Sequence, residues 1–306
     1  MPHEVILLNR LPKRGTINAP KPVHLTQLRK TEAIKPMLRV FITSLTLGLL
    51  SFTSPASNTA KSSAEALGLT STAVEAINSG GSLAEKQLAF DTHTKGVYEK
   101  AGLAGKGLSF DVFQKAYVGF QNLKRQNKIA EGKSILTVVD FTKSSAHKRF
   151  WTIDLKSQKV LFHTLVAHGR NTGNDKAVKF SNQPNSYMSS LGFYVTDAPY
   201  YGKHGLSLRL AGMDEKFNSN AMARAIVLHG ADYVSEAFVK QNGRLGRSLG
   251  CPSVPREISK DIIETIKNKT VLYIHGNDKA YTSNYLNASS AVEAFAVEGA
   301  GNNISI

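Results

Sequence analysis

Residues 228–255 read LHGADYVSEAFVKQNGRLGRSLGCPSVP and contain Cys251, the single cysteine of the 306-residue chain. Gly250 before the cysteine leaves the backbone free to turn, and the proline after it fixes φ, so the stretch predicts a tight turn around the thiol. His229 follows a short apolar run, residues 225–228, which predicts a buried strand. A thiol in a turn and an imidazole at a strand end are the two parts of a cysteine–histidine nucleophilic pair.

The chemistry of such a pair depends on the thiolate. A free thiol with a pKa of about 8.5 is mostly protonated at neutral pH, and a nearby imidazole or other cation stabilises the thiolate that attacks. Gly250 also lets backbone N–H groups approach a reacting carbonyl, so the amides of Gly250 and Cys251 are the predicted oxyanion hole. The alternative is that Cys251 is a small buried hydrophobic residue, as most lone cysteines are.

The spacing of these residues resembles a known signature. His229-Gly230 is followed by 17 residues and then by Ser248-Leu249-Gly250-Cys251. This pattern is similar to the L,D-transpeptidase (YkuD-type) catalytic domain family, in the branch with an S-x-G-C-P motif. The resemblance covers roughly residues 135–276 and extends to three further motifs, at residues 189–194, 202–208 and 246–252.

The chain departs from the commonest form of the family at two positions. That form has a histidine before the Gly-Cys pair and an arginine shortly after the cysteine, where this chain has Leu249 and Ser253. The side chain of Leu249 has no hydrogen-bond donor, so the role of that histidine does not carry over. The positions that carry over one by one are His229, Ser248, Gly250 and Cys251.

The resemblance, together with the strand and helix patterns given below, predicts a mainly β (α+β) fold, in which an L,D-transpeptidase-like β-sandwich or barrel catalytic domain is preceded by a small helical region. It also implies an exported enzyme that acts on peptidoglycan stem peptides through a thioester on Cys251 and forms 3-3 cross-links without a cofactor. If water replaces the acceptor amine, the same fold gives an L,D-carboxypeptidase. The other alternative is a non-catalytic peptidoglycan-binding or scaffold protein in which Leu249 marks a decayed site. The acyl acceptor (stem amine, D-amino acid, protein or water) and the oligomeric state stay open.

Four residues near the motif are the predicted substrate contacts: Ser248, Arg247, Arg244 and His204. The two arginines flank the turn, where they could hold a substrate carboxylate, favour the thiolate, or remain solvated loop side chains. His204 lies in one of the family-like segments, either as a cleft residue or as a structural loop histidine.

The remaining histidines raise the question of a metal site. The candidates are His163, His168, His204 and His275. No H-E-x-x-H or other compact metal-binding spacing is present, and histidines scattered at strand ends are usually surface or core groups. We therefore predict no metal.

The charge of the chain points to an anionic partner. The formal net charge is +15 at pH 7, which suits a nucleic acid, a membrane or an acidic polymer such as the cell wall. No RNP, zinc-finger or basic-heptad signature is present, so no nucleic-acid partner is predicted. A single cysteine excludes an internal disulfide and a cysteine-based zinc site, and an odd thiol in an exported protein is a candidate reactive group.

Residues 1–57 predict a disordered leader followed by a signal peptide. Residues 1–36 are polar, basic and dotted with prolines, and residues 40–52 form an apolar run that ends in small residues. An apolar run of about 7–15 residues describes a secretory signal, whereas a membrane span needs about 20. We therefore expect export to the periplasm or cell envelope, with membrane contact only in transit. Whether translation starts at Met1 or Met37, and whether the signal is cleaved or kept as an anchor, stays open.

The rest of the chain divides by composition into four parts. Residues 58–82 predict a linker, residues 83–130 a helical region with an aromatic packing face, residues 131–276 the catalytic domain, and residues 277–306 a peripheral tail with a weak helix. Within the catalytic domain the pattern predicts seven strands, the first three as an antiparallel meander, and one helix: strands at 135–141, 150–155, 160–167, 191–196, 207–210, 225–228 and 271–275, and the helix at 256–268.

Overall fold

The computed structural model describes residues 81–301, which all belong to one compact unit of the chain. The predicted leader and signal peptide, the choice between two start positions and nearly all of the predicted linker lie outside the described residues. Within the described range, no helix combines the length and apolar character that a membrane crossing needs.

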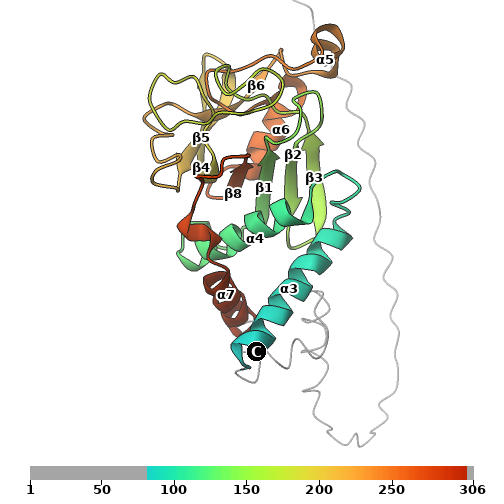
Figure 1. Cartoon of the computed structure of the whole chain (residues 1–306), viewed down its shortest axis with the longest axis vertical. Coiled ribbons are helices and arrows are strands. Elements are labelled where there is room, and N and C mark those ends of the chain that lie inside the picture. Colours follow the sequence, from blue (N-terminus) through green and yellow to red (C-terminus); the bar gives the residue numbers. More distant parts are fainter. Residues whose placement is uncertain (1–80, 302–306) are drawn as a thin grey trace, which may run out of the picture. The chain divides into compact units, whose positions relative to one another are not determined.

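Two helices precede the sheet, α3 (Leu83–Lys100) and α4 (Phe110–Arg125) (Figure 1). Helix α3 begins with a capping box, in which Ser82 and Glu85 each accept a hydrogen bond from the other's backbone N–H. Helix α4 begins at Ser109, whose hydroxyl accepts from the backbone of the first turn. Caps of this kind stabilise a helix by about 1 kcal/mol each, and they fix the starts of both predicted helices.

Eight strands form one sheet in the order β3-β2-β1-β8-β4-β5-β6-β7. The strands are β1 (Ile135–Asp140), β2 (Phe150–Asp154), β3 (Lys159–Thr164), β4 (Gly192–Gly202), β5 (Gly205–Gly212), β6 (Val227–Ala231), β7 (Ser253–Pro255) and β8 (Val271–His275). The pairs β1–β8 and β6–β7 are parallel, and the other pairs are antiparallel. The predicted meander of the first three strands is confirmed.

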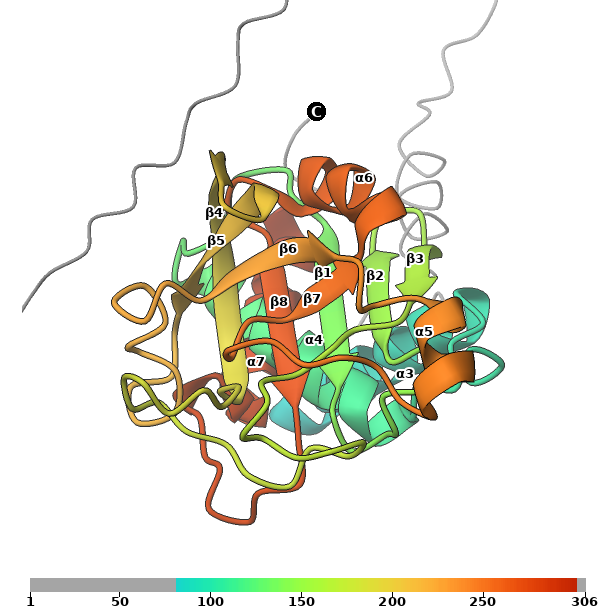
Figure 2. The same cartoon turned by 90° about the horizontal axis from the view of Figure 1, so that it is seen from above.

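The two ends of this sheet meet. The segment after β3 pairs with β7, because Ala167 N donates to Ser253 O at 2.8 Å and Ser253 N donates to Ala167 O at 3.3 Å. The sheet is therefore nearly closed into a barrel, as the predicted fold class required (Figure 2). This closure brings the turn before β7 beside the segment after β3.

Helix α6 (Arg256–Ile266) covers the sheet where β5 and β6 lie (Figure 2). Its isoleucines at 262, 263 and 266 are fully buried in the core that they share with these strands. Gly230 in β6 is required for this packing, because a Cβ there would lie 2.5 Å from Ser259 Oγ and 3.1 Å from Arg256 Cα. The helix thus rests directly on the backbone of the strand that carries His229.

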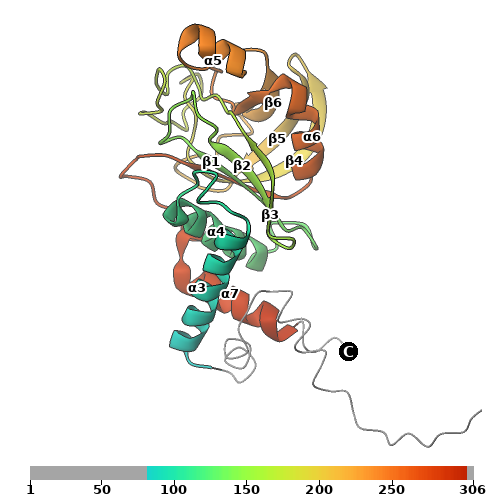
Figure 3. The same ribbon diagram turned by 90° about the vertical axis from the view of Figure 1, so that its right-hand side faces the viewer.

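A second core lies between the sheet and three helices, α3, α4 and α7 (Ala288–Gly301), which gather at one end of the unit (Figure 3). Phe90 of α3 and Phe295 of α7 meet edge to face, with ring centroids 5.6 Å apart. The C-terminal region was expected to be peripheral, and the structure differs, because Val292 and Phe295 are buried. α7 is rich in alanine and only weakly amphipathic, so its sequence does not predict a buried face. The small alanine side chains nevertheless allow it to pack closely against α3 and α4.

All seven predicted strands are present, six of them with shifted ends and β8 with the predicted ends, and the predicted helix after the cysteine turn is α6. Three short elements of the described residues were not predicted, α5 (Glu236–Asn242), β7 and the 3-10 helix η1 (Asn284–Leu286), because seven, three and three residues are too short to show a period. His229 lies inside β6 rather than at its end, since the strand continues through Gly230 to pair with β7.

Candidate active site

The turn around Cys251 is held by Ser248. Its Oγ donates to Cys251 O at 2.6 Å and accepts from Gly250 N at 3.0 Å. Gly250 has a φ of 128°, a conformation that favours glycine, and a Cβ there would lie 2.9 Å from Met188 O. The predicted tight turn is confirmed. The substrate contact of Ser248 and the oxyanion-hole role of the Gly250 amide stay predictions, and in this structure these two groups bind each other.

The thiol of Cys251 is half-buried. Its Sγ accepts from Val227 N at 3.5 Å and its S–H donates to Ala225 O at 3.8 Å. Burial raises the pKa of the Cys251 thiol, whereas the Val227 N–H and the charges of Arg224 and Lys203 oppose that rise. The polar groups around the sulfur therefore favour the thiolate against the cost of burial.

The imidazole of His229 is buried in β6, between Ser207 of β5 and Ser253 of β7. Its Nδ1 lies 3.0 Å from Gly230 O, and its Nε2 lies 3.0 Å from Ser253 Oγ. Because a carbonyl oxygen can only accept, we assign the proton to Nδ1 and a lone pair to Nε2. The orienting partner of His229 is thus the backbone carbonyl of the next residue.

The environment of His229 keeps the imidazole neutral. Burial lowers its pKa, although the Gly230 carbonyl acts in the other direction. Tyr233 extends the hydrogen-bonded chain, with its hydroxyl 3.1 Å from Ser253 Oγ. The ring of His204, in the turn between β4 and β5, stacks on the imidazole with centroids 4.3 Å apart and planes inclined by 19°. His204 is therefore next to the predicted site.

Parallel pairing of β7 with β6 places the sulfur beside the strand that carries the imidazole. His229 lies opposite Ser253 in this register. Two residues earlier on each side are Val227 and Cys251, and there the Val227 N–H donates to the sulfur. Among residues 81–301 no hydrogen bond joins the imidazole to the sulfur, since His229 binds Gly230 and Ser253 instead. Cysteine–histidine contacts that act in a complex are often longer in its absence.

A sequence model of one family, described as the L,D-transpeptidase catalytic domain, matches residues 104–275. This chain belongs to that family. The match contains all the motif residues from His229 to Cys251, and it begins between α3 and α4, inside the region that the sequence analysis set apart as helical.

Solved structures similar to this L,D-transpeptidase family member include three from different bacteria. An L,D-transpeptidase from Mycobacterium smegmatis is 12% identical, with 47% of this chain and 59% of that chain covered and a TM-score of 0.30. An L,D-transpeptidase from Stackebrandtia nassauensis is 20% identical, with 62% and 79% covered and a TM-score of 0.28. The helical cell shape determining protein Pgp2 from Campylobacter jejuni is 10% identical, with 60% and 63% covered and a TM-score of 0.34.

This chain thus spans about three fifths of the length of the Mycobacterium smegmatis protein. Among curated proteins, none matches.

The two arginines that were predicted substrate contacts in this L,D-transpeptidase domain bind backbone carbonyls. Arg247 Nη1 donates to Arg170 O at 3.3 Å and to Gly173 O at 3.1 Å, and Arg244 Nη1 donates to Leu245 O at 2.6 Å. Both side chains are half-buried. They brace the loops beside the turn, and their contact with substrate stays a prediction.

One buried cation in the L,D-transpeptidase domain was not predicted from the sequence. Arg149 is fully buried and donates to Lys143 O at 2.6 Å, to Val166 O at 3.0 and 3.1 Å, and to His168 Nδ1 at 2.7 Å. Burial lowers the pKa of Arg149 to about 9 and that of His168 to about 4, so at neutral pH the guanidinium is charged and the imidazole neutral. Nothing in the sequence indicates this role, because an arginine that binds the carbonyls of a nearby loop belongs to no periodic pattern of apolar residues.

The histidines considered for a metal have other contacts. His163 stacks on Trp151 with centroids 5.2 Å apart, His204 stacks on His229, and His275 Nδ1 lies 3.4 Å from Tyr273 Oη. Within the described residues no group of three or more His, Cys, Asp or Glu side chains could hold a metal ion.

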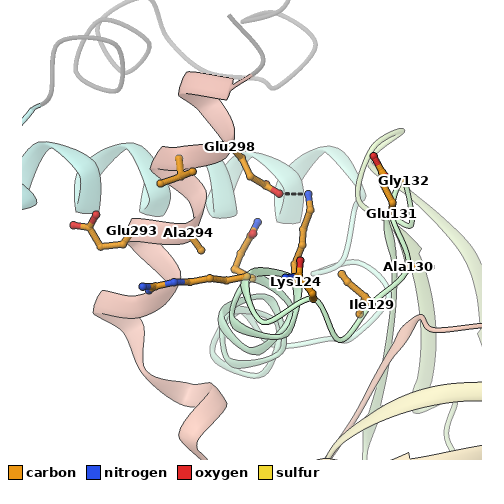
Figure 4. Close-up of a pocket in the computed structure, with 12 residues that line it drawn as sticks. Lys124, Ile129, Ala130, Glu131, Gly132, Glu293, Ala294 and Glu298 are labelled. Atoms are coloured by element: carbon orange, nitrogen blue, oxygen red, sulfur yellow. Dashed lines mark ion pairs between the residues drawn. The ribbon is translucent and has the colours of Figure 1, made fainter. Parts of the chain in front are cut away.

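A cavity of about 710 Å³ lies away from the cysteine turn, between α4, residues 129–132 and α7 (Figure 4). Its lining carries both signs of charge: Lys124 pairs with Glu298, and Glu293 of the same helix as Glu298 lies apart from this pair. None of its lining residues belongs to the motif, so the cavity is separate from the candidate active site.

Proposed function

We propose that this chain is an exported L,D-transpeptidase that acts on peptidoglycan stem peptides with Cys251 as its nucleophile. Family membership supports the reaction class. The observation that carries the proposal is the half-buried thiol at the family motif, which accepts a backbone N–H from the same strand that carries His229. A thiol that is partly exposed and has donors aimed at its sulfur differs from an inert core cysteine.

The first half-reaction begins at the sulfur. The Cys251 thiolate attacks the carbonyl between the L-centre of the stem diamino acid and the terminal D-Ala, and the Val227 N–H stabilises the thiolate before the attack. The tetrahedral oxyanion lies at the backbone amide of Cys251, joined by that of Gly250 once it exchanges its bond to Ser248. When the intermediate collapses, the C–N bond breaks and D-Ala leaves as the free amine after it gains a proton.

His229 takes the thiol proton and then gives it to the leaving D-Ala nitrogen. Since the Gly230 carbonyl holds the proton on Nδ1, the lone pair on Nε2 is the acceptor for the thiol proton. Nε2 now accepts from Ser253 Oγ, so the transfer requires the imidazole to exchange this partner when substrate binds. The second half-reaction reverses the roles: an amine of a neighbouring stem attacks the thioester, loses its proton to Nε2, and releases Cys251.

The test is the incubation of purified tetrapeptide muropeptides with the wild-type chain and with Cys251→Ala. We expect wild-type protein to release D-Ala and to form cross-linked products of higher mass, and Cys251→Ala to lose at least about 10³-fold of the D-Ala release. A Cys251→Ala protein that unfolds at the wild-type temperature and still releases D-Ala at the wild-type rate would overturn the nucleophile assignment.

The same measurement separates the alternatives. Products that lose D-Ala without gaining mass assign water as the acceptor and make the protein an L,D-carboxypeptidase. Retained binding to peptidoglycan sacculi, with no D-Ala release and no thiol reactivity, assigns a binding or scaffold role. Export is tested by fractionation: recovery of the full-length chain only from the cytoplasm would contradict it.

A further inference from the structure

Arg224 lies in the loop before β6, and its guanidinium holds the segment of residues 181–190. Its Nη1 donates to Ser181 O at 2.7 Å and to the hydroxyl of Ser190. Its Nη2 donates to Met188 O at 2.6 Å and to Ser186 Oγ at 3.2 Å. These are four acceptors on one segment, which is the fork geometry that an arginine provides and a lysine does not.

All four acceptors of Arg224 are neutral. They are two carbonyls and two hydroxyls, and in the described part of the chain no ion pair joins Arg224 to a carboxylate. A half-buried cation without a carboxylate partner is costly unless an anion forms nearby. The site thus holds an uncompensated positive charge.

The candidate anion is next to it. A Cβ on Gly250 would lie 3.4 Å from Arg224 Nη2, so the guanidinium packs against the residue that precedes Cys251. The residue after Arg224 is Ala225, whose carbonyl accepts a hydrogen bond from the Cys251 thiol. Val227 of the same segment donates its backbone N–H to the sulfur. Ala225 has a φ of 53°, a left-handed conformation that is unusual for alanine and is maintained only by its surroundings.

The segment that Arg224 holds also contacts the nucleophile turn. Ser189 Oγ donates to Gly250 O at 3.0 Å, and the carbonyl of Met188 lies where a side chain at position 250 would be. The guanidinium therefore links two sides of the sulfur: the wall at residues 181–190 and the loop before β6.

Other charged or titratable groups around the sulfur do not take this place. Lys203, in the exposed turn between β4 and β5, acts on the thiol in the same direction as Arg224 but more weakly. Tyr233 faces the thiol from beyond β6, and burial raises the pKa of its hydroxyl, so it is neutral at pH 7. His229 is neutral and bound to Gly230 and Ser253.

We propose that Arg224 is a positioning residue for Cys251: its guanidinium locks residues 181–190 against the nucleophile turn and supplies the positive charge that stabilises the Cys251 thiolate. This deepens the proposed function, since it rests on Cys251 as the nucleophile. The thiolate itself is measurable without any peptidoglycan substrate.

The test is the pH dependence of alkylation of the full chain by iodoacetamide, followed by intact mass. The only thiol in the sequence is Cys251, so the signal has one origin. Arg224→Gln keeps an amide that can donate but loses the charge, and we expect the midpoint of the alkylation profile to rise by about one pH unit. The alkylation rate at pH 7 then falls about tenfold.

Two further variants complete the experiment. Arg224→Lys keeps the charge and loses the fork, so its midpoint stays close to that of the wild type. Arg125→Gln removes an arginine that also binds a carbonyl and a hydroxyl, those of Ser290, but lies on α4, and its profile is unchanged. A folded Arg224→Gln protein with the wild-type midpoint would refute the proposal. If Arg224→Gln does not fold, an Arg224→Lys midpoint raised by a full unit would refute the stabilisation of the thiolate by the charge, because this variant keeps the charge.

Failure of this inference is distinguishable from failure of the proposed function. A raised midpoint in Arg224→Gln, together with wild-type protein that releases no D-Ala, contradicts the transpeptidase assignment and supports the inference. An unchanged midpoint together with normal D-Ala release by the wild type does the opposite.

Discussion

Gly230 has two separate roles beside His229. Its carbonyl accepts from Nδ1 and so fixes which imidazole nitrogen carries the proton. Its missing side chain leaves room for α6, whose Ser259 and Arg256 lie against it. Because one residue serves both purposes, packing of α6 and orientation of the imidazole depend on the same backbone position.

Gly230→Ala should therefore lower stability by about 1–3 kcal/mol, because the added methyl overlaps Ser259 Oγ and the backbone of α6. Urea unfolding at pH 7 measures this. The matched control is Gly96→Ala in α3, where a Cβ meets nothing within 4 Å. There we expect about 0.5–1 kcal/mol of added stability from the better helix propensity of alanine. Equal effects of the two substitutions would contradict the packing described for Gly230.

At the scale of elements, α7 completes the core that α3 and α4 begin. Phe295 contacts Phe90 and His93 through their rings, with centroids 5.6 and 5.0 Å apart. The ring of Phe295 is 5% exposed, whereas Val297, two residues on, is 70% exposed. Neighbouring positions of one helix thus differ strongly in what they bury.

Phe295→Ala should cost about 3–5 kcal/mol, because it removes a buried ring and leaves a cavity between α3 and α7. Val297→Ala on the exposed side should change stability by less than about 0.5 kcal/mol. Thermal unfolding of both variants is the measurement. A Phe295→Ala protein as stable as Val297→Ala would mean that α7 does not pack as described.

The elements also separate what the sequence could predict from what it could not. β8 was predicted at its observed ends, because a short run of four apolar residues and a histidine lies between polar turns. β7 was not predicted, since three residues with a proline pair only through the closure of the barrel. The sequence motif identified Cys251 and His229. Arg224 was not predicted, because only the folding of the chain brings it beside Gly250, and it lies at no recognisable spacing from the motif.

At the scale of the whole molecule, buried histidines make stability depend on pH. His168 is fully buried, and its folded pKa of about 4 lies below the ordinary value of 6.5, with burial as the first cause and the charge of Arg149 as the second. Between these two values the unfolded chain binds more protons than the folded chain, so stability is fully present above pH 6.5 and is lost as the pH falls toward 4.

We expect His168 to account for up to about 3 kcal/mol of stability lost between pH 6.5 and 4. His168→Gln keeps an oxygen that can accept from Arg149 and should show a flatter dependence of the free energy of unfolding on pH over this range. His147→Gln, at an exposed position, should keep the wild-type slope. Parallel slopes for His168→Gln and the wild type would contradict the burial of a neutral imidazole.

The parallel pairing of β1 with β8 affects how the protein folds during its synthesis. Leu136 of β1 lies opposite Val271 of β8, so β1 has only β2 as a neighbour until the ribosome has made residues 271–275. Pairings over such separations close slowly, because the intervening loop must be ordered first. The sheet is therefore completed only once residues 271–275 have been made, and until then the edge of β1 that pairs with β8 is open to other nascent chains.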